Sequence, residues 1–220
     1  MSVNTILKQM RQAGRLQDIR AKGDLGEDAA LAVVHSYYNK KGCLLYKGFT
    51  YKYASDKRSK SYIGNVFLQQ DGSYTAISEK SLSDEIDILY ISNYRIFPIE
   101  IKSYHAKLDL TVKYLKKNGV IQYGVSGHKN PIWQSEKHAR HLYHRLYDVI
   151  PDGEPRYIQP IVCFTDRCEL HDERSDEHKF YLPCVILNTL KQCLCDFDVP
   201  QKYRLNIAEI EKKLEKIKKG

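Results

Sequence analysis

The 220-residue chain has no apolar run near the roughly eighteen residues that a membrane span needs. Its first ten residues lack the apolar region of a secretory signal. Only 12 glycines and 7 prolines are present, which excludes collagen-like and linker-like chains. With 42% hydrophobic residues, the chain can form a packed core. We therefore expect a cytoplasmic protein that makes no membrane contact.

The six cysteines include no Cys-x-x-Cys pair, the arrangement with which zinc fingers and zinc ribbons hold their metal. The closest two, Cys193 and Cys195, lie in a segment that also holds Leu190 and Leu194. This setting is typical of free thiols in a reducing compartment, buried or half-buried.

The net charge of +8 is distributed unevenly. Residues 1–22 and 201–220 each carry +4, so residues 23–200 are neutral as a whole. Within that neutral part, residues 40–60 carry +6 and residues 102–145 carry +7. Such blocks attract a phosphate backbone, although they are also compatible with solvated Lys-rich loops. The candidate nucleic-acid contacts are Lys57, Arg58, Lys60, Lys107, Lys113, Lys129 and Lys137.

Helical and strand patterns alternate along the chain. Residues 3–21 have helical apolar spacing, and a second helix follows Gly23, with Asp24 as candidate N-cap and Glu27 three residues later. Further helices are expected over residues 131–149, over 189–194 and after Asn206. Strands are expected over residues 83–92, 96–103, 158–164 and 180–187, and a polar meandering hairpin over 104–130. The order predicts a mixed α/β domain over residues 22–200, with a basic amphipathic helix at each terminus, residues 1–21 and 201–220.

The hairpin over residues 83–103 carries three charged residues in an apolar setting. Glu100 and Lys102 are two residues apart and share a strand face, and Asp87 lies within reach on the preceding strand. Burying such charges is unfavourable unless they pair or bind a metal. The two carboxylates and the carbonyl of Ile101 are oxygen ligands suited to Mg²⁺, and Lys102 could support an attacking water. The alternative is an edge hairpin with a surface Glu–Lys pair.

Four short motifs occur in a fixed order between residues 22 and 165. They are Gly26-Glu27, Asp84-Glu85-Ile86-Asp87, Ile99-Glu100-Ile101-Lys102 and Asn130-Pro131-x-x-Gln134-x-x-x-His138. Together they resemble the nuclease-related domain family, which is similar to the restriction-endonuclease-like nucleases. One departure is that no tryptophan lies between Lys102 and Asn130, where Tyr114 and Tyr123 occur instead.

The resemblance implies a mixed central sheet flanked by helices and a Mg²⁺-dependent nuclease that acts on DNA. We expect an endonuclease in which Mn²⁺ can replace Mg²⁺. By this resemblance Asp87 and Glu100 bind the metal, Lys102 is the catalytic lysine, and Glu27 contacts the metal directly or through water. Gln134 would lie near a substrate phosphate or a metal-bound water.

Several of these residues also have structural explanations. Glu27 fits a capping box with Asp24, and Gln134 could be solvated in the first turn of its helix. His138 is interpreted as a residue that either supports the site groups from behind or packs beside them, whereas His141 and His144 are expected mostly at the surface because helical geometry turns them away. Trp133 is expected to act as an apolar anchor.

Two other functions remain open from the sequence. One is a nucleic-acid-binding module that keeps the fold without turnover. The other is an adaptor or assembly protein that forms a homo-oligomer or binds partners through its terminal helices.

Overall fold

The computed structural model describes residues 25–37, 43–53, 66–68, 74–76, 82–104, 106–124, 130–165 and 168–219. The predicted helix over residues 1–21 and the candidate cap Asp24 lie outside this part of the chain. Four of the candidate nucleic-acid contacts, Lys57, Arg58, Lys60 and Lys129, also lie outside it. In the described part, no helix is both long and apolar enough to cross a membrane.

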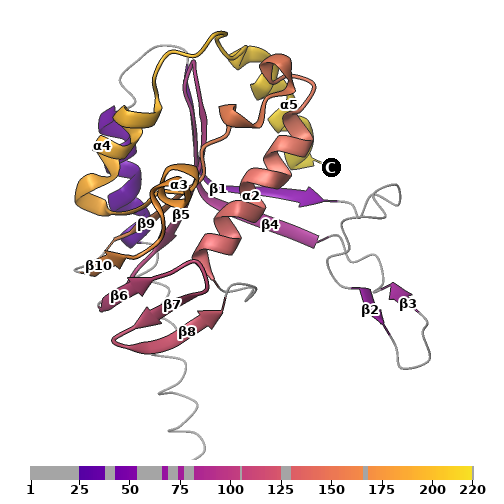
Figure 1. Ribbon diagram of the computed structural model, residues 1–220. Coiled ribbons are helices and arrows are strands. Elements are labelled where there is room, and N and C mark those ends of the chain that lie inside the picture. Colours follow the sequence, from indigo (N-terminus) through magenta and orange to yellow (C-terminus); the bar gives the residue numbers. More distant parts are fainter. Residues whose placement is uncertain are drawn as a thin grey trace, which may run out of the picture.

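A five-stranded mixed sheet forms the centre of the fold (Figure 1). Its strands, in spatial order, are β1 (Leu44–Tyr53), β4 (Leu82–Ile91), β5 (Ile96–Lys102), β9 (Ile161–Phe164) and β11 (Cys184–Ile186). The β1–β4–β5 part is antiparallel, whereas β5, β9 and β11 are parallel. The predicted hairpin is therefore confirmed as β4 and β5, in the middle of the sheet rather than at its edge.

Two smaller sheets complete the described strands. One contains β10 (Glu169–Asp172), β6 (Lys107–Leu110), β7 (Tyr114–Lys117) and β8 (Val120–Gly124), and the other pairs β2 (Val66–Leu68) with β3 (Tyr74–Ala76). The antiparallel β6, β7 and β8 follow β5 directly in the chain and confirm the meandering hairpin predicted over residues 104–130.

Helices cover both faces of the central sheet. On one face, α2 (Pro131–Leu146) and α5 (Ile207–Lys219) pack on a core that includes Leu89 and Ile96. On the other, the helix formed by residues 25–37 and α4 (Leu187–Phe197) pack on a core that includes Ile99 and Ile101. In Figure 1 the indigo helix lies beside α4, and α2 crosses in front of β1 and β4.

The last helix forms as the sequence predicts, with Asn206 at its start. The Asn206 carboxamide oxygen accepts a hydrogen bond from the Glu209 backbone N–H at 3.3 Å. Its apolar residues Ile210, Leu214 and Ile217 are buried against the central core. The apolar stripe of α5 therefore packs against the rest of the chain and is not exposed for binding a partner helix.

The strand predicted over residues 180–187 is partly wrong. Phe180 and Tyr181 instead end a short helix, α3 (Asp176–Tyr181), and are exposed, and only Cys184–Ile186 form a strand. Ser175 caps α3 by accepting a hydrogen bond from the His178 N–H, which favours a helix where the apolar residues suggested a strand.

His141 is half-buried rather than at the surface, which corrects the expectation from helix geometry. Its Nδ1 lies 3.1 Å from the hydroxyl of Tyr51 on β1. Burial, together with the nearby Lys137 ammonium, lowers the pKa of His141 to about 4.

We expect His141 to make the fold less stable in acid. Because its pKa is lower in the folded than in the unfolded chain, the unfolded chain binds more protons between pH 6.5 and 4. The free energy of unfolding should fall by about 1–3 kcal/mol across that window, allowing for partial exposure. In His141→Gln the free energy of unfolding, measured by urea unfolding at each pH, should change less between pH 6.5 and 4. If the variant loses as much stability over this pH range as the wild-type protein does, His141 is not the cause of the loss.

Candidate active site

The candidate site lies where β4 and β5 separate. Their ladder extends from Ile91↔Ile96 to Ile88↔Ile99, so Asp87 and Glu100 are the next residues on the two strands. Directly opposite residues of an antiparallel pair share a face of the sheet. Instead of continuing the ladder, the Asp87 carboxylate accepts a hydrogen bond from the Ile101 N–H at 2.6 Å. The two predicted metal ligands are thus brought together.

The backbone of Ile101 is directed toward Asp87. On the next residue, the Lys102 carbonyl accepts a hydrogen bond from the Thr165 N–H, on the β9 side of β5. Backbone groups of successive strand residues point to opposite sides. The Ile101 carbonyl therefore points to the β4 side, as its N–H does, which is compatible with the predicted third oxygen ligand.

Glu100 is almost completely buried, with its side chain 3% exposed. Its Oε1 accepts a hydrogen bond from the Lys102 ammonium. Its Oε2 lies 3.4 Å from His138 Nδ1 without hydrogen-bond geometry, and neither atom has a hydrogen-bond partner among the described residues. A buried carboxylate oxygen of this kind favours a cation or a hydrogen-bond donor.

The charge balance of the site also favours a cation. Burial raises the pKa of Asp87 to about 7, with repulsion from Glu100 and Glu27 outweighing the attraction of Lys102. Among the described residues, no three His, Cys, Asp or Glu side chains form a metal centre by themselves. Two carboxylates and a backbone carbonyl suit Mg²⁺, because this ion commonly keeps several waters and binds few protein ligands.

Glu27 reaches the site from the helix formed by residues 25–37. Its charge is the smallest of the named influences on the raised pKa of Asp87, behind burial and the charge of Glu100. Its carboxylate lies 3.9 Å from the Lys47 ammonium. The contact between Glu27 and the metal that the resemblance implies stays a prediction.

Two glycines near the site lie where a Cβ would crowd a neighbouring side chain. Gly48 of β1 has φ = 60° and lies between the pairs Lys47↔Ile88 and Phe49↔Ile86, so no side chain from β1 stands opposite Asp87. Gly26, just before Glu27, is buried against the ends of β5 and β9. A Cβ there would lie 2.7 Å from the Thr165 hydroxyl oxygen.

We expect Gly26→Ala to displace the start of this helix and to lower the free energy of unfolding by about 1–3 kcal/mol. Thr165→Ala removes the atom that the new Cβ would meet, so the double variant should recover part of the loss. Urea unfolding of the three variants measures this coupling. Strictly additive effects would contradict a close contact between Gly26 and Thr165.

The start of α2 explains the Asn-Pro part of the fourth motif. The Asn130 side chain accepts a hydrogen bond from the Ile132 N–H at 3.0 Å, and Pro131 is the first helical residue. This start places Gln134 and His138, one turn apart, on the same side of the helix. Gln134 is half-buried, and its Oε1 is a buried atom without a hydrogen-bond partner in the described residues.

The sequence did not single out Asp84 as a functional residue, although it lies in the second motif. Its carboxylate pairs with Lys137 Nζ at 2.6 Å and faces His138 Nε2 at 3.4 Å. Burial alone would raise the pKa of Asp84, but hydrogen bonds from His138 and Lys137 hold it well below its usual range. Only the tertiary contact with α2 reveals this role.

The described basic residues have different settings. Lys107 at the start of β6 and Lys113 in the following turn are exposed, as a nucleic-acid contact requires. Lys137 is instead half-buried in its pair with Asp84. Lys116 and Lys117 on β7, which the sequence did not single out, have their ammonium groups over the rings of Tyr114 and Tyr104.

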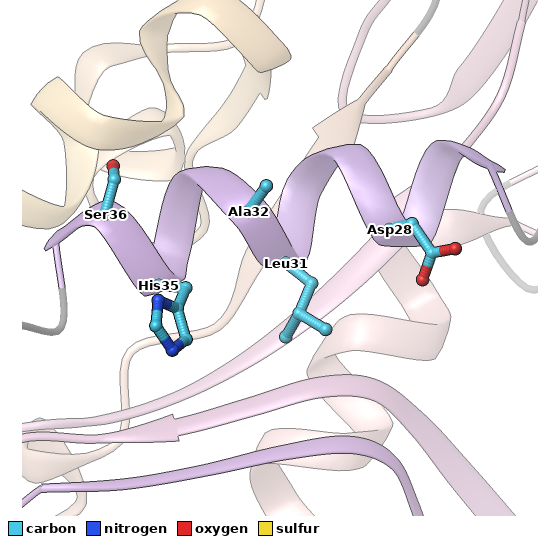
Figure 2. Close-up of a pocket in the computed structure, with 5 residues that line it drawn as sticks. All are labelled: Asp28, Leu31, Ala32, His35 and Ser36. Atoms are coloured by element: carbon cyan, nitrogen blue, oxygen red, sulfur yellow. The ribbon is translucent and has the colours of Figure 1, made fainter.

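A shallow hollow lies along the helix of residues 25–37, apart from the acids (Figure 2). Its lining residues, Asp28, Leu31, Ala32, His35 and Ser36, follow helical spacing on one face. None of the predicted catalytic residues lines it.

The mixed sheet between helices, with two acids and a lysine where two strands separate, is consistent with a restriction-endonuclease-like fold. The family model of the nuclease-related domain matches residues 22–165, which include all four motifs. The chain belongs to this family, which is part of the restriction-endonuclease-like superfamily. A nuclease-related function follows from this membership. Neither a curated protein nor a solved structure matches the chain.

Proposed function

We propose that the protein is an endonuclease that hydrolyses phosphodiester bonds of DNA and depends on Mg²⁺, with Mn²⁺ as a substitute. The observation that carries this proposal is the juxtaposition of Asp87, Glu100 and Lys102 at the point where β4 and β5 separate. Asp87 and Glu100, with the Ile101 carbonyl, are the groups that would hold the ion. Glu27 adds negative charge from a neighbouring helix.

A divalent cation held there would supply Lewis-acid polarisation of a phosphoryl oxygen and a more acidic water. The protein groups supply orientation and charge. The Lys102 side chain is 24% exposed. Its ammonium can contact a phosphate and stabilise the negative charge that grows during attack on phosphorus. The exposed Lys107 and Lys113 are proposed to contact the DNA backbone without reading its sequence.

The test is incubation of the purified protein with supercoiled plasmid and linear duplex DNA in Mg²⁺, in Mn²⁺ and in chelator. Glu100→Gln, which keeps the size of the side chain, serves as the matched variant. We expect nicking or cutting of both substrates by the wild-type protein with metal, and none in chelator or by the variant. Equal cleavage by Glu100→Gln, or cleavage that persists in chelator, would contradict the proposal.

Salt-dependent binding of DNA by the wild-type protein, without cleavage in either metal, would identify a binding module instead.

A further inference from the structure

His138 is the most deeply buried ionisable group facing the acids from α2, with its side chain 3% exposed. Its two ring nitrogens face two different carboxylates. Nδ1 lies 3.4 Å from Glu100 Oε2, and Nε2 lies 3.4 Å from Asp84 Oδ1. The imidazole thus bridges a proposed metal ligand and an acid to which the resemblance gave no role.

This imidazole is held in place from several sides. The buried Ser135 hydroxyl on α2 donates a hydrogen bond to the Ile161 carbonyl of β9 at 3.3 Å, which fixes the helix over the sheet. Asp84, on the far side of the ring, is itself held by Lys137 from the same helix. The ring is therefore held by its helix and by Asp84.

The carboxylate of Glu100 has a different partner on each oxygen. Lys102 contacts Oε1 and His138 faces Oε2. Because the terminal torsion of a glutamate is broad, one partner alone leaves its carboxylate free to turn. With a proton on each ring nitrogen, His138 can donate to Asp84 through Nε2 and to Glu100 through Nδ1 at the same time. A second donor restricts the rotation of Glu100, and such donors to metal-binding carboxylates typically change metal affinity by about 10–100-fold. The 3.4 Å separation is long for a hydrogen bond, as is common for catalytic contacts before substrate binds.

We propose that His138 is a positioning residue that holds the Glu100 carboxylate in the orientation that binds the divalent cation, and that Asp84 fixes the imidazole for this task. This inference rests on the proposed function, because it assigns His138 to the proposed metal site. It differs from a packing role, which would affect stability and leave cation affinity unchanged.

The test is the dissociation constant for Mn²⁺, measured by calorimetry on the wild-type protein and on two variants. His138→Leu keeps an apolar bulk of similar size but has no donor, and should weaken Mn²⁺ binding about 10–100-fold. His138→Asn places an amide N–H near the position of Nδ1 and should restore affinity to within about threefold of wild type. His141→Asn, a histidine change on the same helix, should leave the affinity unchanged.

If His138→Leu does not fold, as judged by its thermal melt, Asp84→Asn tests the same arrangement. Its matched control is Glu85→Gln, which removes the same charge from the exposed neighbouring residue. Asp84→Asn should weaken Mn²⁺ binding clearly more than Glu85→Gln does.

The outcomes separate the two proposals. Wild-type Mn²⁺ binding with unchanged affinity in His138→Leu, or equal effects of Asp84→Asn and Glu85→Gln, would overturn the positioning role alone. If the wild-type protein binds no Mn²⁺, both the positioning role and the proposed metal dependence fail.

Discussion

Replacing Lys102 by methionine is expected to lower the rate of Mg²⁺-dependent DNA cleavage by about 10²–10⁴-fold while leaving cation affinity nearly unchanged. Methionine keeps the length and apolar stem of the side chain but removes the charge that contacts Glu100. Without that ammonium, Glu100 loses one of the two groups that orient it, but the site also loses a positive charge that repels a cation, so these two effects on cation affinity oppose each other. A developing phosphate charge loses its stabilisation without any such compensation. The measurements are single-turnover cleavage and Mn²⁺ calorimetry.

Lys213→Met is the matched control for this change. Lys213 lies on α5, is 33% exposed and pairs with Asp148, away from the acids. The Lys213→Met protein should cleave DNA at the wild-type rate. If Lys102→Met cleaves DNA as fast as the wild-type protein, Lys102 has no part in the mechanism. If the variant loses Mn²⁺ binding together with cleavage, Lys102 supports the cation site rather than the reaction.

Asp87→Asn is expected to make the metal-free protein more stable. At pH 8 the wild-type Asp87 is ionised in a half-buried position near Glu100, although its pKa is raised to about 7. Asparagine carries no charge and its oxygen can still accept the Ile101 N–H. In chelator we expect the free energy of unfolding to rise by about 1–3 kcal/mol, which corresponds to about 2–12 °C in Tm.

The stability difference between Asp87→Asn and the wild-type protein depends on pH. The folded chain holds a proton on Asp87 more tightly than the unfolded chain, so the wild-type protein loses stability as the pH rises from about 4 to about 7. The advantage of the variant should therefore be absent near pH 3 and complete above pH 8. Added Mg²⁺ should reverse the comparison, because it raises the Tm of the wild-type protein by binding the folded state and leaves the variant unchanged.

Glu85→Gln controls for the loss of one negative charge on the same strand. Glu85 is exposed, so its replacement should change stability by no more than about 0.5 kcal/mol. If Asp87→Asn is less stable than wild type in chelator, the favourable contacts of the Asp87 carboxylate outweigh its burial and its repulsion from Glu100, contrary to this account. An equal Mg²⁺-induced rise of Tm in Asp87→Asn would remove Asp87 from the proposed cation site.

Local sequence patterns predicted the parts of the fold that depend only on residues close together in the sequence. Strand alternation around Asp87 and Glu100 identified the central hairpin, because side chains two apart share a face wherever the strand is regular. Pro131 and Asn206 marked the starts of α2 and α5, because proline fits the first helical position and a side-chain cap acts over three residues. These signals require no knowledge of distant contacts.

The parts that the sequence did not predict depend on tertiary contacts. Asp84 is three residues from Asp87, so regular alternation would place it on the opposite face, yet it contacts His138 and Lys137 of α2. His141 was expected at the surface because helix rotation turns it away from His138, but β1 supplies Tyr51 on that side. Similarly, the spacing of Gly26 and Glu27 did not indicate how closely Thr165 approaches the helix.

The measurement that tests the central claim most directly is the anomalous scattering of Mn²⁺ in crystals of the wild-type protein and of Glu100→Gln. The claim is that Asp87 and Glu100 together hold a divalent cation beside Lys102. We expect one strong peak in contact with both carboxylates in the wild-type crystal and its loss in the variant. Mn²⁺ bound elsewhere while the wild-type protein cleaves DNA, or a peak that persists at this position in Glu100→Gln, would contradict the claim.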